Sequence, residues 1–147
     1  MKFRKIDHIG INFNDLPAAK AFFLDLGCEV VGEEKGGGEF LDNVIGLKGA
    51  KTEFVMVALP EGGATLELIK YLTPLDAAGI QQSQANTLGI RHITIVVDDV
   101  EAIVARIKPK GMELVGEIEN YQDVYKLCYV RGPEGIILEL AEELNKP

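Results

Sequence analysis

The sequence has few cysteines, few positive charges and no long apolar run, and each shortage excludes a class of protein. Two cysteines, Cys28 and Cys128, do not make a disulfide framework, and we expect both to be ordinary semi-buried thiols. A formal net charge of -8 disfavours nucleic acid or an anionic membrane as a partner. Because the longest apolar runs are only strand-sized and the N-terminus lacks a signal-peptide core, we expect a cytoplasmic protein with no membrane span.

The chain does contain an internal repeat. Its 147 residues, 47% of them hydrophobic, suit one compact domain with a sizeable core. Residues 6–33 align without a gap on residues 90–117 at an offset of 84. Further on, PEGGATLEL aligns with GPEGIILEL at an offset of 72, so the first module carries 12 extra residues, around the segment EKGGGEFLDNVIGLKGAK. In the first alignment, identical residues occur at Ile6, His8, Ile9, Ile11, Asp15, Ala18, Ala21, Gly27, Glu29, Val31, Gly32 and Glu33.

Both modules predict a strand, a helix and three further strands. The alternating stretches HIGINF and HITIVV indicate the first strands. A helix of about ten residues follows an acidic start in each module and ends at Gly27 or Gly111, where we expect the next strand to begin. The remaining strands are expected at 52–59, 64–71, 124–130 and 136–141.

These elements predict an α+β fold made of two tandem βαβββ modules that form a cup-shaped mixed sheet. The whole chain, 1–147, is then one domain. We place the first module at 5–72, a linker at 73–88 and the second module at 89–143.

Strand alternation places one histidine and one glutamate of each module on the same sheet face. In the first module Ile9 and Ile11 should face the helix while His8 faces away, and Glu67 faces away from the core formed by its leucine neighbours. In the second module, His92 and Glu139 follow the same pattern. If the helix-free faces curl into one cup, the only two histidines of the chain meet two carboxylates inside it.

Two imidazoles and two carboxylates suit a first-row divalent metal ion, which neutralises carboxylates that are otherwise costly to desolvate. Taken singly, a strand histidine is more often a hydrogen-bonded core residue, and a strand glutamate is more often an edge residue with its carboxylate in water. The joint pattern favours a metal site with ligands His8, Glu67, His92 and Glu139. Ni, Co, Zn, Mn and Fe(II) all accept this set, which leaves two octahedral positions for water or substrate.

The stretches IDHIGI, LELIKYL, IRHITIVVDDVEA and RGPEGIILELAEEL resemble the vicinal oxygen chelate superfamily, which includes glyoxalase I, methylmalonyl-CoA epimerase, extradiol dioxygenases, and fosfomycin- and bleomycin-resistance proteins. The resemblance implies paired βαβββ modules, a divalent metal held by one residue from each stretch, and a homodimer. A glutamate in the second ligand place, Glu67, is typical of the proton-transfer branch. Bleomycin-resistance binders lack the metal ligands.

This resemblance implies a metal-dependent lyase or isomerase, either glyoxalase-like or epimerase-like, that transfers a proton next to a carbonyl of a small oxygen-chelating substrate. Glu139 is the expected base, or Glu67 if it leaves the metal. Glu53 lies near a strand where epimerases place a second base, although a solvated side chain is the simpler interpretation. The alternatives are an Fe(II) extradiol-type dioxygenase, which a fourth protein ligand disfavours, and a non-catalytic protein that sequesters a small molecule.

The substrate is expected to be small and mostly apolar. The short bacterial glyoxalases present an arginine and an asparagine to glutathione at places that correspond here to Asn12 and Tyr71, which disfavours a glutathione adduct. The 12 extra residues, with Gly36–Gly38, suit either a lid or a plain surface loop. The expected cavity residues are Asn12, Thr65, Ile69, Tyr71, Thr94 and Val96.

Overall fold

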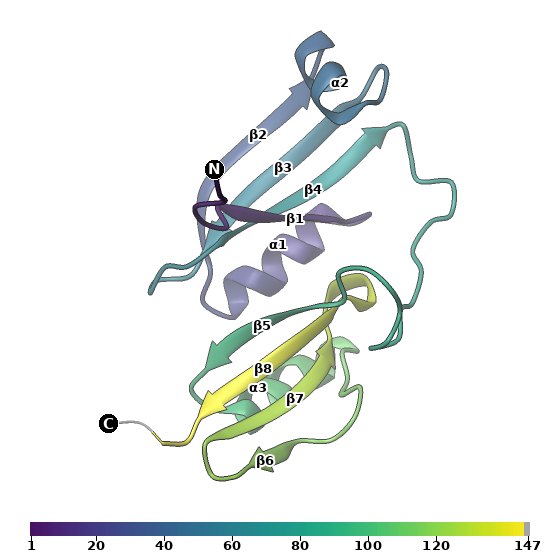
Figure 1. Ribbon diagram of the computed structural model, residues 1–147. Coiled ribbons are helices and arrows are strands. Elements are labelled where there is room, and N and C mark those ends of the chain that lie inside the picture. The colour runs from purple at the N-terminus through teal and green to yellow at the C-terminus, as the bar shows by residue number, and fades with distance from the viewer. Residues whose placement is uncertain (146–147) are drawn as a thin grey trace. The chain divides into compact units, whose positions relative to one another are not determined.

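In the computed structural model, which describes residues 1–145, the chain divides into two compact units, Met1–Gly79 and Ile80–Pro147. Each unit contains a four-stranded mixed sheet with a helix lying against one face (Figure 1). The predicted α+β class with two βαβββ modules is therefore confirmed. No helix among the described residues is long and apolar enough to cross a membrane.

The first unit has its four strands in the order β1-β4-β3-β2, with β1 and β4 parallel and the other pairs antiparallel. Its elements are β1 (His8–Asn12), α1 (Leu16–Asp25), β2 (Glu29–Gly37), α2 (Glu39–Ile45), β3 (Lys51–Ala58) and β4 (Thr65–Thr73).

The second unit repeats this topology in the order β5-β8-β7-β6, again with a parallel pair, β5 and β8. Two short 3-10 helices, η1 and η2, interrupt its connections. Its elements are β5 (His92–Val97), α3 (Val100–Ile107), η1 (Lys108–Lys110), β6 (Glu119–Tyr121), β7 (Tyr125–Arg131), η2 (Pro133–Gly135) and β8 (Ile137–Glu143).

Equivalent aspartates begin the two main helices. Asp15 Oδ1 accepts a hydrogen bond from the backbone N–H of Ala18 at 3.1 Å, and Asp99 Oδ1 accepts one from Ala102 at 3.0 Å. Each bond satisfies an N–H that has no partner within its helix. The repeat therefore fixes where both helices start, at the end of the strand that carries the histidine.

The core lies between each helix and one face of its sheet. Phe23 of α1 and Leu68 of β4 are almost fully buried in the first unit, as are Ile107 of α3 and Leu138 of β8 in the second. The opposite face carries His8 and Glu67 in one unit and His92 and Glu139 in the other, because side chains alternate along each strand. The sequence therefore predicted the helix-facing leucines correctly.

Two local features differ from the expectation. Gly36 and Gly37 belong to β2 rather than to a loop, and a Cβ at Gly36 would collide with the hydroxyl of Thr52. The helix α2 follows, so the extra residues lengthen a strand and add a helix rather than form a plain loop. In the second unit no strand follows Gly111 directly. Only Leu114 makes an isolated bridge, to Val130, before β6 begins at Glu119.

Candidate metal centre

A histidine and a glutamate occur at the same register in both units. In the parallel pair β1 and β4, Glu67 lies opposite Gly10, two residues after His8. In β5 and β8, Glu139 lies opposite Thr94, two residues after His92. Two residues along a strand bring the side chain back to the same face. Each unit therefore presents one imidazole and one carboxylate as diagonal neighbours on its helix-free face.

The pair of the second unit is in contact. His92 Nε2 lies 3.3 Å from Glu139 Oε1, and the Thr94 hydroxyl donates a hydrogen bond to the same oxygen at 2.7 Å. On the other side of the imidazole, the Tyr129 hydroxyl lies 3.3 Å from His92 Nδ1, and the two rings pack with centroids 4.9 Å apart. The side chains of His92 and Glu139 are 35% and 20% exposed. They are thus oriented by neighbours and still accessible.

The pair of the first unit is held from a different side. His8 Nδ1 lies 2.8 Å from Asp7 Oδ2, and this contact is the main cause that raises the pKa of His8, with a smaller contribution from the charge of Glu67. The same contact, helped by Lys5, lowers the pKa of Asp7. Asp7 is therefore a carboxylate over the whole physiological range, and the His8 Nδ1 faces an acceptor.

The donor set fits a divalent transition metal. Two ligand atoms each about 2.1 Å from one octahedral ion lie about 3 Å apart, close to the 3.3 Å between His92 Nε2 and Glu139 Oε1. Imidazole and carboxylate are both ligands that Zn, Ni, Co, Mn and Fe(II) accept. The structure brings the four predicted ligands together as two pairs, one within each unit.

The predicted cavity residues lie on the same faces as these pairs. Thr65 lies opposite His8, and Asn12 lies opposite Ile69 in the ladder between β1 and β4. Tyr71 is two residues beyond Ile69 on β4. Thr94 proves to be more than lining, because its hydroxyl is a direct partner of Glu139.

Glu53 does not belong to this face, and its interpretation as a second base is wrong. The antiparallel register places Glu53 opposite Lys70, whereas Met56 lies opposite Glu67. Glu53 and Glu67 both have odd numbers, but this does not place them on the same face, because the turn between their strands sets the register. Glu53 lines a cavity of about 420 Å³ on the α1 side of the sheet, together with Leu16, Pro17, Lys20, Glu33, Glu34, Lys35, Phe54 and Val55. This cavity is on the face opposite His8.

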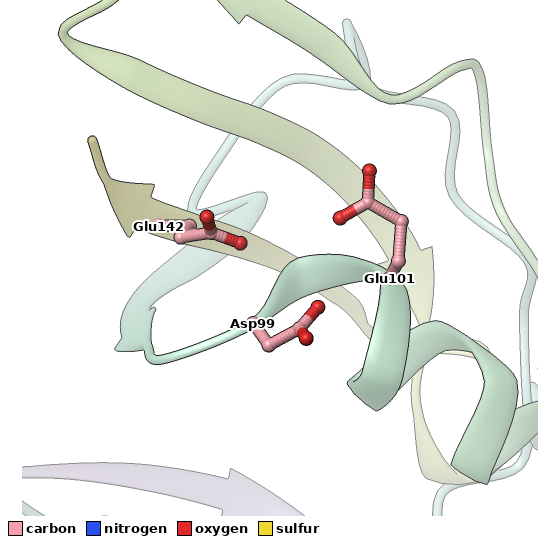
Figure 2. Close-up of side chains that lie close together, drawn as sticks. All are labelled: Asp99, Glu101 and Glu142. Carbon is pink, nitrogen blue, oxygen red and sulfur yellow. The ribbon is translucent and has the colours of Figure 1, made fainter.

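Three carboxylates also gather where α3 begins. Figure 2 shows Asp99 and Glu101 at the start of the helix and Glu142 on β8. One ligand atom of each lies within 4.8 Å of the other two. Glu142 accepts a hydrogen bond from the Val100 N–H at 2.9 Å and Glu101 accepts one from Lys126 at 3.1 Å, while Asp99 is the helix cap. The partial positive charge of a helix N-terminus and the ammonium of Lys126 account for this cluster without an ion.

Sequence reasoning missed two neighbours of the histidines. Asp7 directly precedes His8 in the stretch IDHIGI, and Tyr129 lies on β7 directly opposite Glu139. Counting residues across the turn RGPEG would have placed Tyr129 there, since Arg131 and Ile137 are the last pair of that hairpin. Nothing in the sequence distinguishes Asp7 from an ordinary solvated residue.

The fold agrees with comparisons to known proteins. The chain superposes on a glyoxalase family protein from Bacillus cereus with a TM-score of 0.93 and 36% identity, covering 99% of this chain and 97% of that one. The glyoxalase I of Leishmania major, described as trypanothione-dependent, gives a TM-score of 0.64 and 22% identity, with coverage of 96% and 88%. The fosfomycin resistance protein FosX from Listeria monocytogenes gives a TM-score of 0.61 and 20% identity, with coverage of 99% and 96%.

At these lower identities the likeness shows the fold alone. The chain has no significant match among curated protein sequences. The sequence model of one family covers residues 5–140, which is nearly the whole chain and includes both histidines and both glutamates. The chain belongs to the Glyoxalase/Bleomycin resistance protein/Dioxygenase superfamily.

Proposed function

We propose that this chain is a divalent-metal-dependent enzyme that moves a proton at the carbon next to a carbonyl, as a lyase or an isomerase. The observation that carries this proposal is the repeated register: each unit places a histidine and a glutamate as diagonal neighbours on its helix-free face. Because the same arrangement arises twice from one repeated segment, its residues serve one purpose rather than two separate structural needs.

In this proposal His8, Glu67, His92 and Glu139 hold one ion, with the two pairs brought together within one chain or between the two chains of a homodimer. When bound, the cation supplies stabilisation of the negative charge that develops on a substrate oxygen as the adjacent C–H is broken. The second-unit distance of 3.3 Å between Nε2 and Oε1 supports two ligands of one ion, and an ion that takes six ligands would keep two positions for substrate.

Glu139 is the proposed base. Its Oε1 already receives the Thr94 hydroxyl and faces the His92 ring, so the carboxylate is fixed in position, and its side chain is 20% exposed. A carboxylate held this way can take a proton at Oε2, the oxygen that these contacts leave outside the hydrogen bonds, and return it to a neighbouring carbon. Glu67 offers the same group from the first unit, opposite a glycine rather than a threonine.

The substrate we propose is small, mostly apolar and chelating through two oxygens. Asn12, Thr65, Ile69 and Tyr71 offer an amide, two hydroxyls and an aliphatic surface on the face that carries His8. We also propose a cytoplasmic location.

An antibiotic binding protein from Streptomyces sp. CB03234 shares the fold at a TM-score of 0.63 and 17% identity, so a protein that binds a small molecule without turnover is the competing proposal.

Proton exchange in D2O tests the proposal without knowledge of the natural substrate. Protein loaded with Ni, Co, Zn, Mn or Fe(II) is incubated with 2-oxo acids, hemithioacetals of 2-oxoaldehydes and 2-methyl-malonyl thioesters, and the loss of the proton next to the carbonyl is followed by NMR. We expect metal-dependent exchange on at least one class, lost in Glu139→Gln and kept in Glu143→Gln, a neighbour on the same strand. Tight binding without exchange would support sequestration, and oxygen consumption with catechols would support a dioxygenase.

A further inference from the structure

We infer that Asp7 and Tyr129 are positioning residues that hold the two histidines in opposite neutral tautomers before any ion binds. The tautomers follow from the donor and acceptor groups that face the two nitrogens of each ring. Only their purpose rests on the proposed function: the Nε2 lone pair of His8 is ready for a cation, while Tyr129 can accept from Nδ1 once a cation takes the place of the Nε2 proton of His92.

In the first unit the partner of His8 can only accept. Asp7 Oδ2 lies 2.8 Å from Nδ1, and an ionised carboxylate has no proton to donate. Nδ1 of the neutral ring therefore carries the proton, and Nε2 keeps its lone pair. A carboxylate that holds the far nitrogen in this way is a common outer partner of a metal-binding histidine. His8 is thus already in the tautomer that binds a cation through Nε2.

In the second unit the carboxylate faces the other ring nitrogen, Nε2 instead of Nδ1. The acceptor-only group, Glu139, faces Nε2 at 3.3 Å, so Nε2 of neutral His92 carries the proton. Nδ1 then has the lone pair, and the Tyr129 hydroxyl at 3.3 Å donates to it. A phenol can both donate and accept, so Tyr129 can also hold the other tautomer, in which Nε2 loses its proton, Nδ1 gains one, and the phenol oxygen accepts.

Asp7 and Tyr129 have no counterpart in the other unit: at the repeat position of each, the other unit has a residue that cannot play the same part. The residue at the place of Asp7 in the second unit is Arg91, which has no acceptor to offer Nδ1. The residue at the place of Tyr129 in the first unit is Met56, which lies opposite Glu67 as Tyr129 lies opposite Glu139 and has no hydroxyl. Each unit therefore has one partner for its histidine Nδ1, and each takes that partner from a different element.

The chain suits a direct measurement because it has only two histidines. Metal-free protein labelled with 15N-histidine is studied by long-range 1H–15N NMR at a pH where both rings are neutral, and the signals are assigned with His8→Ala. We expect one ring protonated at Nδ1, which disappears in His8→Ala, and one protonated at Nε2. Asp7→Ala, which removes the acceptor, should return His8 to the mixture of tautomers found in water, and Tyr129→Phe should shift the Nδ1 signal of His92 alone.

Cobalt affinity provides the second readout. Loss of an outer partner should weaken Co(II) binding about 10-fold in Asp7→Ala and in Tyr129→Phe. The matched controls Lys5→Ala, which removes the other partner of Asp7, and Tyr125→Phe, on the same strand as Tyr129, should leave the affinity unchanged. Identical tautomers in the wild type, or an unchanged His8 tautomer in Asp7→Ala, would overturn the inference even if cobalt binds. Opposite tautomers in a protein that binds no cobalt would support the inference and contradict the proposed function.

Discussion

The two units of this protein carry the same pair of side chains but surround it differently. His8 is held by the residue before it and Glu67 lies opposite a glycine, while His92 is held by a tyrosine two strands away and Glu139 lies opposite a threonine that donates to it. The shared features are those set by the backbone register. The differing features are those set by single side chains.

This difference shows which parts of the repeat serve which purpose. The strand pairing and the aspartate caps recur because both units need the same backbone to place a histidine beside a glutamate. The immediate neighbours are free to diverge, and they make the two carboxylates unequal. Glu139 is oriented by two contacts to one oxygen, and this inequality makes Glu139 rather than Glu67 the proposed base.

The largest expected effect is a difference in proton-exchange rate between variants of the two glutamates. Glu139→Gln should reduce metal-dependent proton exchange about 100-fold or more, since a general base contributes on that scale. Glu67→Gln should leave cobalt bound and change the rate less, because Gln still offers a ligand oxygen. Exchange rates and cobalt titrations on both variants check this. Equal losses in the two variants would mean that the units share the proton transfer.

The hydrophobic cores offer a second comparison. Leu68 and Leu140 hold equivalent places on β4 and β8 and are 0% and 3% exposed. Replacing either with Ala should cost about 2–5 kcal/mol of unfolding free energy, through lost burial and the cavity left behind. Cys28 reports on the first unit and Cys128 on the second, since both are buried free thiols.

Thiol labelling in mild urea then localises the damage. Leu68→Ala should speed labelling of Cys28 more than that of Cys128, and Leu140→Ala should do the reverse, because each core belongs to its own compact unit. Equal acceleration at both cysteines would show that the units open together.

The same cysteines predict a pH dependence. Burial raises the pKa of both thiols, so the folded protein keeps them protonated where the unfolded chain begins to ionise. The unfolded state then binds fewer protons than the folded state, and the free energy of unfolding should fall as the pH rises above about 8.5. Urea titrations across this range measure the slope. Replacing both cysteines with Ala should flatten it, and an unchanged slope would count against buried thiols as its cause.

The smallest expected effect concerns the helix caps. Asp15→Ala should cost about 1 kcal/mol, a common value for a lost N-cap. Asp99→Ala should cost less, because removing it relieves repulsion with Glu101 and Glu142 while Glu142 still accepts from the Val100 N–H. Thermal unfolding compares the two. Cobalt binding should be unaffected in Asp99→Ala. If the variant lost cobalt binding, the ion would bind at this acidic cluster instead of at the histidines.

The repeat and the strand alternation predicted the fold and the helix-facing leucines, because both depend on backbone periodicity that the sequence displays directly. The helix α2 and the late start of β6 did not follow from the sequence, since the glycines before α2 suggested a loop and Gly111 suggested an immediate strand. Tyr129 and Asp7 were missed as partners because such contacts depend on register and side-chain direction. The assignment of His8, Glu67, His92 and Glu139 as ligands stays a prediction.

The most direct test of the central claim is a titration of metal-free, untagged protein with Co(II), followed by absorbance. If the two pairs act as one site, the wild type binds one ion per chain, and His8→Ala and His92→Ala each abolish that binding. Retention of the ion by either variant, two independent ions per chain, or no binding at all would contradict a single site built from both units.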